Sequence, residues 1–286
     1  MYPNSVNFYF KASEIAFLTK HKKELIVAPI LEPFLGTKIK AVSTYDTDLL
    51  GTFTREIKRV DTQLETARLK AQIAIEQSGL KYGIGSEGSF DLDPYMSIIP
   101  WNIEMLVFID DIKKYEIIGM AEGPAKILNF TTNSFIELKE KALQIGFPEQ
   151  HVILRAESEN NDFIIKNITT FNELYRAYRK CVKKSSNGMV FIENDLRAYA
   201  CPSRQEIIKL AAINLLMKMH SFCPSCNTPG FWVSDVEKGL PCEYCKLPTD
   251  VIKEQVYTCQ KCGFKKLTER PDLKYAEQMY CNYCNP

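Results

Sequence analysis

Short apolar runs recur through residues 1–200, separated by segments in which apolar residues return every three or four positions. The short runs are rich in Ile, Val, Phe and Tyr and have the length of β-strands. They lie at Ile15–Thr19, Lys38–Val42, Tyr82–Ser86, Ile103–Ile109, Tyr115–Ile118, His151–Leu154 and Met189–Ile192. The fourth and fifth runs, joined by a short polar segment, predict a hairpin. Strands alternating with helices predict an α/β fold with a mixed sheet.

Helix-start signals lie between these runs. Each is a capping box, in which a Ser or Thr precedes a Glu by three positions and the two cap the first turn. The four pairs are Thr62 with Glu65, Ser134 with Glu137, Thr170 with Glu173, and Ser203 with Glu206. The first two predicted helices end at Gly79 and Gly146. Residues 23–36 are ambiguous, because Pro29 and Pro33 would interrupt a helix there.

Cysteines are concentrated at the carboxyl end of the chain. Eight of the ten lie in the last 64 residues as four Cys-x-x-Cys pairs, a pattern typical of zinc sites. The pairs are Cys223 with Cys226, Cys242 with Cys245, Cys259 with Cys262, and Cys281 with Cys284. Gaps of fifteen residues between the first two pairs and eighteen between the last two favour ligation by adjacent pairs. Interleaved ligation, first pair with third and second with fourth, remains an alternative, as does a redox dithiol for any single pair.

These features predict three parts. Residues 1–200 form the α/β domain, 201–220 a connecting helix, and 221–286 tandem four-cysteine zinc ribbons that hold two structural Zn²⁺ ions. The helix includes the apolar segment Leu210–Met219, which we expect to be buried. Cys181 and Cys201 stand apart from the pairs and are expected to be buried thiols rather than metal ligands.

Charge limits the choice of partner. The formal net charge is +1, which argues against binding to DNA mainly through bulk electrostatics. From residue 221 onward eight Lys or Arg balance eight Asp or Glu, and each zinc held by four thiolates adds about two negative charges. Aromatic residues there could stack on bases. The charge nevertheless favours a structural or protein-docking module over nucleic acid as a partner.

Nothing in the sequence suggests a membrane. No apolar run approaches the roughly 18 residues that span a bilayer. The first residues also lack the basic and apolar regions of a secretory signal. We therefore expect a soluble, cytoplasmic protein with no membrane partner.

Polar and glycine-rich segments provide candidate chemistry. Asp46 and Asp48 lie in one polar loop, and Glu87 lies in the Ser86–Ser89 segment that follows a predicted strand. In open α/β sheets ligands gather at the carboxyl ends of strands, and the glycine of this segment, Gly88 next to Ser89, would let the backbone approach one closely. The simpler interpretation of either aspartate alone is a solvated turn.

The same residues have the chemistry of phosphoryl transfer. The three carboxylates, Asp46, Asp48 and Glu87, could hold Mg²⁺, and Lys20, Lys23 and Lys70 could offset the charge of phosphate. Farther along, Arg197 and Arg204 could bind a phosphate, or they could pair with carboxylates and pin the ribbons to the α/β body.

Several motifs resemble an uncharacterised bacterial family of unknown function that has a zinc ribbon at its carboxyl end. The resemblance would cover nearly the whole chain, but it implies no activity. Relatives would have a Gly-Pro-His-Pro-like sequence where this chain has Asp91–Pro94, so a histidine there is absent. The motifs are Thr19–Glu24, Asp46–Asp48 with Gly51–Phe53, Ser86–Phe90, Arg197–Ala198 with Pro202–Arg204, and Cys223–Cys226 with Pro229–Gly230.

Residues 13–150 also resemble, more distantly, the inosine/xanthosine triphosphate pyrophosphatases. The similar segments are Glu65–Ala71, Tyr82–Gly88 and the strand Leu106–Asp110 after Trp101. The resemblance implies an elongated α/β fold and magnesium-dependent cleavage of noncanonical purine triphosphates.

Particular residues carry this second resemblance. Thr19, Lys20 and the nearby Lys23 would stand at the family's phosphate loop, although His21 replaces its asparagine. Lys70 and Glu87 would match a basic residue and an acid of the family, and Ser89 replaces a glycine that would follow Gly88.

Two functions follow as hypotheses. In the first, the α/β domain binds a nucleotide or related phosphate ester and hydrolyses it with Mg²⁺. Glu87, Asp46, Asp48 and Lys70 would then be catalytic, and the zinc ribbons would be structural or docking modules. In the second, the protein is a noncatalytic adaptor whose ribbons bind a protein or nucleic acid.

Overall fold

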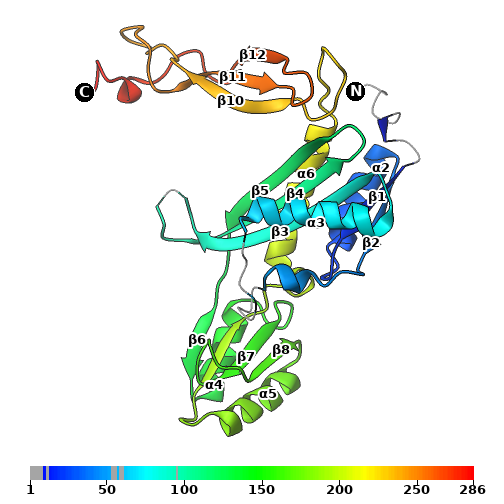
Figure 1. The fold of residues 1–286 in the computed structure, drawn as a ribbon. Helices are drawn as coiled ribbons and strands as arrows, with labels where there is room; N and C mark the ends of the chain where they lie inside the picture. The colour runs from blue at the N-terminus through cyan, green and yellow to red at the C-terminus, as the bar shows by residue number, and fades with distance from the viewer. Residues whose placement is uncertain (1–8, 11–12, 53–56, 58–60, 95) are drawn as a thin grey trace. The chain divides into compact units, whose positions relative to one another are not determined.

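The structure of the chain is a computed structural model, which describes residues 9–10, 13–52, 57, 61–94 and 96–286. The chain folds into two compact units. The larger takes in residues 1–114 and 118–215, and the smaller takes in residues 115–117 and 216–286. Figure 1 shows the course of the chain.

A five-stranded mixed sheet forms the centre of the larger unit. Its order is β2-β1-β3-β4-β5, with β1 parallel to both neighbours and β3 antiparallel to β4 (Figure 1). The predicted mixed α/β fold and the hairpin of the fourth and fifth runs are thus confirmed. The resemblance to triphosphate pyrophosphatases gains no support. The strands are β1 (Glu14–Leu18), β2 (Lys38–Val42), β3 (Tyr82–Leu92), β4 (Pro100–Asp110) and β5 (Tyr115–Pro124).

The ambiguous segment is helix α2 (Glu24–Leu35), which contains both prolines. It ends at Gly36, whose φ of 63° is the left-handed conformation that glycine adopts readily. Val27, Leu31 and Leu35 form the buried face of this helix. Packing of that face therefore outweighs the hydrogen bonds lost at Pro29 and Pro33.

Helix α3 (Gln63–Ser78) lies directly against β3, and two glycines make this approach possible. It starts as predicted at Thr62, whose hydroxyl accepts from the Glu65 N–H, and ends at Gly79. A Cβ at Gly85 would lie 2.0 Å from the carbonyl oxygen of Ala67, and one at Gly83 2.4 Å from that of Ala71. These glycines bring a helix, rather than a ligand, close to the strand.

The larger unit also contains a second sheet, antiparallel throughout, which was not predicted as separate from the first. Its order is β6-β9-β7-β8. Helices α4 and α5 start at the predicted caps Ser134 and Thr170 and supply Leu138 and Leu174 to its core. Strand β6 has only four residues, and neither β6 nor β8 alternates apolar and polar positions, so neither was predicted. The elements are β6 (Asn129–Thr132), α4 (Phe135–Gln144), β7 (Val152–Ala156), β8 (Ile164–Ile168), α5 (Phe171–Lys184) and β9 (Val190–Asn194).

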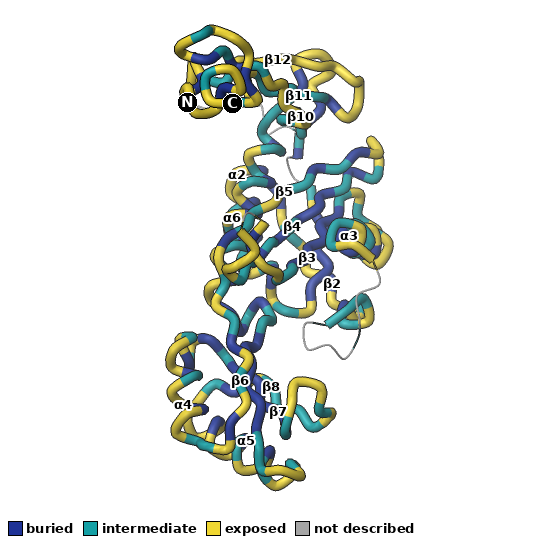
Figure 2. The backbone as a smooth tube through the Cα atoms, turned by 90° about the vertical axis from the view of Figure 1, so that its left-hand side faces the viewer, coloured by how far each residue is buried: buried dark blue, intermediate teal, exposed yellow. Residues whose placement is uncertain are grey.

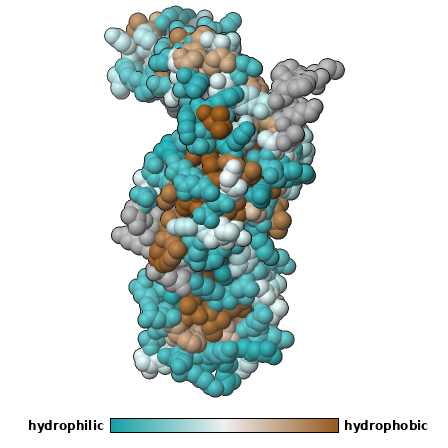
Figure 3. Space-filling model, turned by 45° about the vertical axis from the view of Figure 1, so that its right-hand side comes forward, coloured by the Kyte–Doolittle hydropathy of each residue, from teal (hydrophilic) through white to brown (hydrophobic). Residues whose placement is uncertain are grey.

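Most buried residues lie in the sheets and beneath the helices that cover them. The central strands of both sheets are largely buried, whereas α3, α4 and α5 expose their outer faces (Figure 2). On the face shown in Figure 3, hydrophobic side chains reach the surface in separate groups among hydrophilic ones.

Helix α6 (Pro202–Met219) begins one residue before the predicted cap, so Ser203 lies in its first turn. Proline suits this first position because its missing N–H is not needed there. The expectation that Leu210–Met219 is buried holds for one face only, since Leu210, Ile213 and Met217 are exposed. None of the helices within the described residues is long and apolar enough to cross a bilayer.

The smaller unit is built on one three-stranded antiparallel sheet in the order β10-β11-β12. These strands are β10 (Trp232–Lys238), β11 (Ile252–Thr258) and β12 (Lys265–Glu269). Few large apolar side chains are buried in this unit, Phe231 and Leu240 among them. A core of this size needs additional stabilisation, which metal ions commonly supply.

Candidate functional site

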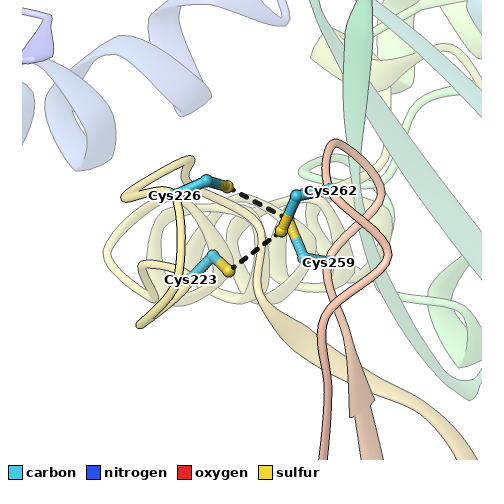
Figure 4. A group of neighbouring side chains, drawn as sticks. All are labelled: Cys223, Cys226, Cys259 and Cys262. Carbon is cyan, nitrogen blue, oxygen red and sulfur yellow. Dashed lines mark hydrogen bonds between the residues drawn. The ribbon is translucent and has the colours of Figure 1, made fainter.

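The eight paired cysteines form two groups, each able to hold one metal ion. Within each group the four sulfur atoms all lie within 4.8 Å of one another. Figure 4 shows the first group, in which two cysteines face two others across a small gap. The first group is Cys223, Cys226, Cys259 and Cys262, and the second is Cys242, Cys245, Cys281 and Cys284.

The interleaved alternative is therefore correct, and the favoured pairing of adjacent Cys-x-x-Cys pairs is wrong. The strand register gives the reason. Trp232 of β10 lies opposite Thr258 of β11, so the turn before β10 meets the turn after β11. The second and fourth pairs follow β10 and β12 and meet beyond the other end of the sheet. Sequence gaps could not reveal this, because they count residues along the chain rather than across the sheet.

The four turns share one backbone geometry. In each, the residue after the second cysteine donates its N–H to the carbonyl oxygen of the first cysteine. Three of these residues, Asn227, Lys246 and Gly263, have φ between 55° and 72°. The donors are Asn227, Lys246, Gly263 and Asn285, at 2.8–3.1 Å.

Sulfur spacing fits zinc. A regular tetrahedron with Zn–S bonds of about 2.3 Å has S···S edges of about 3.8 Å. Across the first group, Cys223 to Cys262 is 3.7 Å and Cys226 to Cys259 is 3.6 Å. In the second group the corresponding distances are 4.0 and 3.5 Å. The two groups can thus hold two Zn²⁺ ions.

The two remaining cysteines are buried and belong to neither group. Burial raises the pKa of Cys181 to about 12, so its thiol stays protonated. Both match the expectation of buried thiols.

In the larger unit, a cleft of about 630 Å³ opens beside β3. Its position depends on two strands of unequal length. The register of β1 against β3 ends at Phe17 opposite Ile84, whereas β3 continues to Leu92. The expected strand end at Ser86 is therefore wrong, because Ser86 lies inside β3. Strand β1 ends at the cleft, as do β3 and β9, because their last residues Leu18, Leu92 and Asn194 all line it.

The loop after β1 and the Asp46–Asp48 loop meet at this cleft. Lys20 Nζ lies 2.7 Å from an Asp46 carboxylate oxygen and 2.6 Å from one of Asp48, and His21 Nε2 lies 3.2 Å from Asp48. Thr19 Oγ1 accepts the Lys23 N–H. Burial lowers the pKa of His21 to about 4 despite the opposing effect of Asp48. Asp46 also caps a short 3-10 helix (Thr47–Leu50) and does not itself line the cleft.

Glu87 and Lys70 form an ion pair on the α3 side of β3, and both line the cleft. Gln63 holds the strand backbone beside them, because its side-chain amide donates to the Glu87 and Ile103 carbonyl oxygens at 3.0 and 2.9 Å. The Ser89 hydroxyl in turn donates to Gln63 at 2.9 Å. Lys70 and Glu87, both predicted as site residues, thus lie side by side.

A buried charge cluster occupies the other face of β3. Lys23 Nζ donates to Ser86 Oγ at 2.6 Å and lies 3.5 Å from Glu104, which also pairs with Arg204. Burial is the main reason that the pKa of Lys23 falls to about 8. Glu104 and Ser86 were not predicted as site residues. Glu104 is the one charged residue in the apolar run Ile103–Ile109, and this could have marked it as a candidate site residue.

Gly88 has a different role from the one expected. A Cβ on it would lie 2.3 Å from Glu104 Oε1 and 2.4 Å from Arg204 Nη2. The glycine therefore makes room for this ion pair rather than for a ligand. Asn102 also donates to Glu104, at 3.1 Å.

Both arginines near α6 pair with carboxylates of the larger unit. Arg197 makes two hydrogen bonds to Asp195, and Arg204 makes two to Glu104. Both arginines thus have carboxylate partners, as one alternative expected, but those partners lie in the larger unit and not in the zinc module. Arg197 and Arg204 both line the cleft.

The expected magnesium ligands do not come together. Among the described residues, the groups of three or more His, Cys, Asp or Glu with ligand atoms within 4.8 Å are the two cysteine groups alone. Asp46, Asp48 and Glu87 form no such group, because lysines on different elements hold them: Lys20 for the aspartates and Lys70 for the glutamate.

Comparison with known proteins identifies a family without an assigned activity. No curated protein and no solved structure matches the chain. Residues 70–286, about three quarters of the sequence, match a family described as a domain of unknown function, DUF6671. The match includes β3, the buried cluster apart from Lys23, and all eight paired cysteines. The chain belongs to the DUF6671 family.

Proposed function

We propose that the cleft of the larger unit binds a small phosphate ester of nucleotide size. The observation that carries this proposal is the convergence of Lys20, Lys70 and Arg197, from three separate elements, on one cleft. Its volume of about 630 Å³ lies within the roughly 300–1,000 Å³ of typical small-molecule sites.

The backbone also favours an anion there. Helix α2 begins beside the cleft, and its N-cap residue Lys23 makes no side-chain cap hydrogen bond. The first N–H groups of a helix carry partial positive charge and attract phosphate. Phosphate on Lys20 and Lys70 would compete with their present carboxylate partners, Asp46, Asp48 and Glu87.

Zinc has a structural role in this proposal. The two cysteine groups lie beyond opposite ends of one small sheet, where bound ions would hold the strands together. Magnesium is not required for the proposed binding. For Glu87 or Asp48 to hold it, each would have to exchange a lysine for the ion.

Binding can be measured by calorimetry on the zinc-loaded full chain, with inorganic phosphate, AMP and ATP, each with and without Mg²⁺. We expect a phosphate ester to bind, and Lys70→Met to weaken its binding about 10- to 150-fold, because one charge-assisted hydrogen bond contributes about 1.5–3 kcal/mol. Lys209→Met, which removes an exposed lysine paired with Glu206, is the matched control. Absence of binding, or equal affinity in both variants, would contradict the proposal.

Hydrolysis is tested separately by phosphate release from the same panel. We expect release to require Glu87 if the Lys70–Glu87 pair orders the reacting phosphate. Glu87→Gln keeps the shape of the side chain and removes its charge. Activity unchanged by this substitution would place the chemistry elsewhere.

Protein docking is a second candidate function, favoured by the surface of the second cysteine group. Tyr244 and Tyr283, which directly precede Cys245 and Cys284, are each 76% exposed. Exposed aromatic side chains of this kind often form binding hot spots. If they bind a partner, the double variant Tyr244→Ser/Tyr283→Ser should keep its zinc and lose that partner in affinity capture.

A further inference from the structure

Ser86 and Lys23 form a close pair on the wall of the cleft. The Lys23 amine lies 2.6 Å from the Ser86 hydroxyl, and both residues line the cleft. Lys23 is 8% exposed and Ser86 is 4% exposed. A serine hydroxyl within hydrogen-bond distance of a base, in a water-poor site, is the arrangement that activates a nucleophile.

The surroundings of Lys23 determine whether its amine can act as that base. Charged groups from four packed elements influence it: Glu104 of β4, Arg204 of α6, Glu87 of β3 and Lys70 of α3. His21 lies in the same loop. Burial, which has the largest effect, together with the two cations, lowers the pKa to about 8, while the two glutamates oppose this. About a tenth of the amine is therefore neutral near pH 7.

We propose that Ser86 is a nucleophile and Lys23 its general base, and that together they cleave an acyl ester of the ligand held in the cleft. The position of the anionic part of that ligand rests on the proposed function. Lys20 and Lys70 would hold its phosphate, and Lys23 would act as base rather than as phosphate ligand.

The steps balance without a cofactor. The neutral Lys23 amine takes the proton of Ser86 as Oγ attacks the carbonyl carbon, and the carbonyl oxygen becomes an oxyanion. The ester C–O bond then breaks, and the leaving alcohol takes the proton from Lys23. Water then attacks the carbonyl carbon of the acyl-Ser86 as Lys23 takes one of its protons. The bond from Ser86 Oγ to that carbon breaks, Oγ takes the proton back from Lys23, and a carboxylic acid is released.

Charge in the cluster suits this reaction. With Lys23 neutral, Glu104 and Arg204 balance each other. Once Lys23 gains the proton, the cluster carries one excess positive charge at the moment that the oxyanion forms. A phosphoryl group against Lys23 would instead raise its pKa and keep the amine protonated. This difference favours an acyl carbon over phosphorus as the centre attacked by Ser86.

A fluorophosphonate probe tests the pair directly, because its uncharged phosphorus reacts with activated serines. Ser86 Oγ would bond to phosphorus as the P–F bond breaks, with the proton passing to Lys23. The zinc-loaded full chain is treated with the probe, and the labelled peptide is identified by mass spectrometry. We expect the label on Ser86, and loss of labelling in Ser86→Ala and Lys23→Met but not in Lys209→Met.

The pH dependence separates a base from a merely structural lysine and requires no variant. With a pKa of about 8, the neutral fraction of Lys23 rises about 90-fold between pH 6 and pH 9, and the labelling rate should rise with it. No label on Ser86 at pH 9, or a rate independent of pH, would overturn the inference. If Ser86 is labelled but no phosphate ester binds, the proposed function fails and the pair stands. If phosphate esters bind but Ser86 is not labelled, the inference about Ser86 and Lys23 fails and the proposed function remains.

Discussion

Arg204 of α6 and Glu104 of β4 form an ion pair in which both residues are almost fully buried, 2% and 0% exposed. Nε of the arginine lies 2.5 Å from one carboxylate oxygen, and Nη2 lies 3.3 Å from the other. The pair joins elements 100 residues apart and packs against Gly88. It also supports Lys23, so the charge balance of the cluster depends on it.

Removing one member of this pair should be costly. Glu104→Gln would leave Arg204 and Lys23 buried without their shared carboxylate, and we expect a loss of about 3–5 kcal/mol in the free energy of unfolding. Urea denaturation measures it. Glu104→Gln/Arg204→Met should recover part of that loss, because it removes the uncompensated charge. A loss in the double variant equal to the sum of the losses in Glu104→Gln and Arg204→Met alone would show that the pair is not coupled.

Gly85 should tolerate no side chain. Its Cβ would lie 2.0 Å from a backbone oxygen of α3, so Gly85→Ala must push the helix away from β3, and we expect a loss of about 3 kcal/mol. Gly123→Ala is the matched control, because the nearest atom there is the end of the flexible Ile207 side chain, at 2.9 Å. Similar unfolding free energies for the two variants would contradict this packing.

His21 should make stability depend on pH between about 6.5 and 4. Burial lowers its pKa to about 4 in the folded chain, against about 6.5 when unfolded, so the unfolded state binds more protons in this window. Stability therefore falls as pH falls from 6.5 to 4, and His21→Gln should reduce the slope. Asp46 and Asp48, whose pKa values are lowered by Lys20 contacts, titrate below this window. An unchanged slope in urea denaturation at pH 5 and 7 would contradict this role.

The interleaved cysteine groups make an unusual prediction about zinc content. Cys223→Ser/Cys259→Ser alters one group, and the chain should retain about one Zn²⁺. Cys223→Ser/Cys242→Ser alters both and should lower affinity at both sites. Pairing of adjacent motifs predicts the opposite outcome for the two variants. Metal analysis after dialysis against a mild chelator distinguishes them.

Features that depend on local sequence signals could be predicted, whereas contacts between distant parts of the chain could not. The caps at Thr62, Ser134 and Thr170 were predictable because a capping box is complete within four residues. The cysteines that complete the first group with Cys223 could not be predicted, because the register of the strands determines which pairs meet. In the same way, Ser86 lay inside a recognised motif, but its lysine partner is 63 positions away. Such contacts depend on the packing of α2, β4 and α6 around β3, which no short pattern encodes.

The cleft beside β3 is the proposed ligand site of this protein. A crystal structure of the zinc-loaded chain grown with saturating AMP, or with whichever phosphate ester binds most tightly in solution, would show whether a ligand occupies it. We expect the phosphate group within hydrogen-bond distance of the Lys20 or Lys70 amine, beside the first turn of α2. A phosphate ester bound away from this cleft, with the Lys20 and Lys70 ion pairs undisturbed, would contradict the claim.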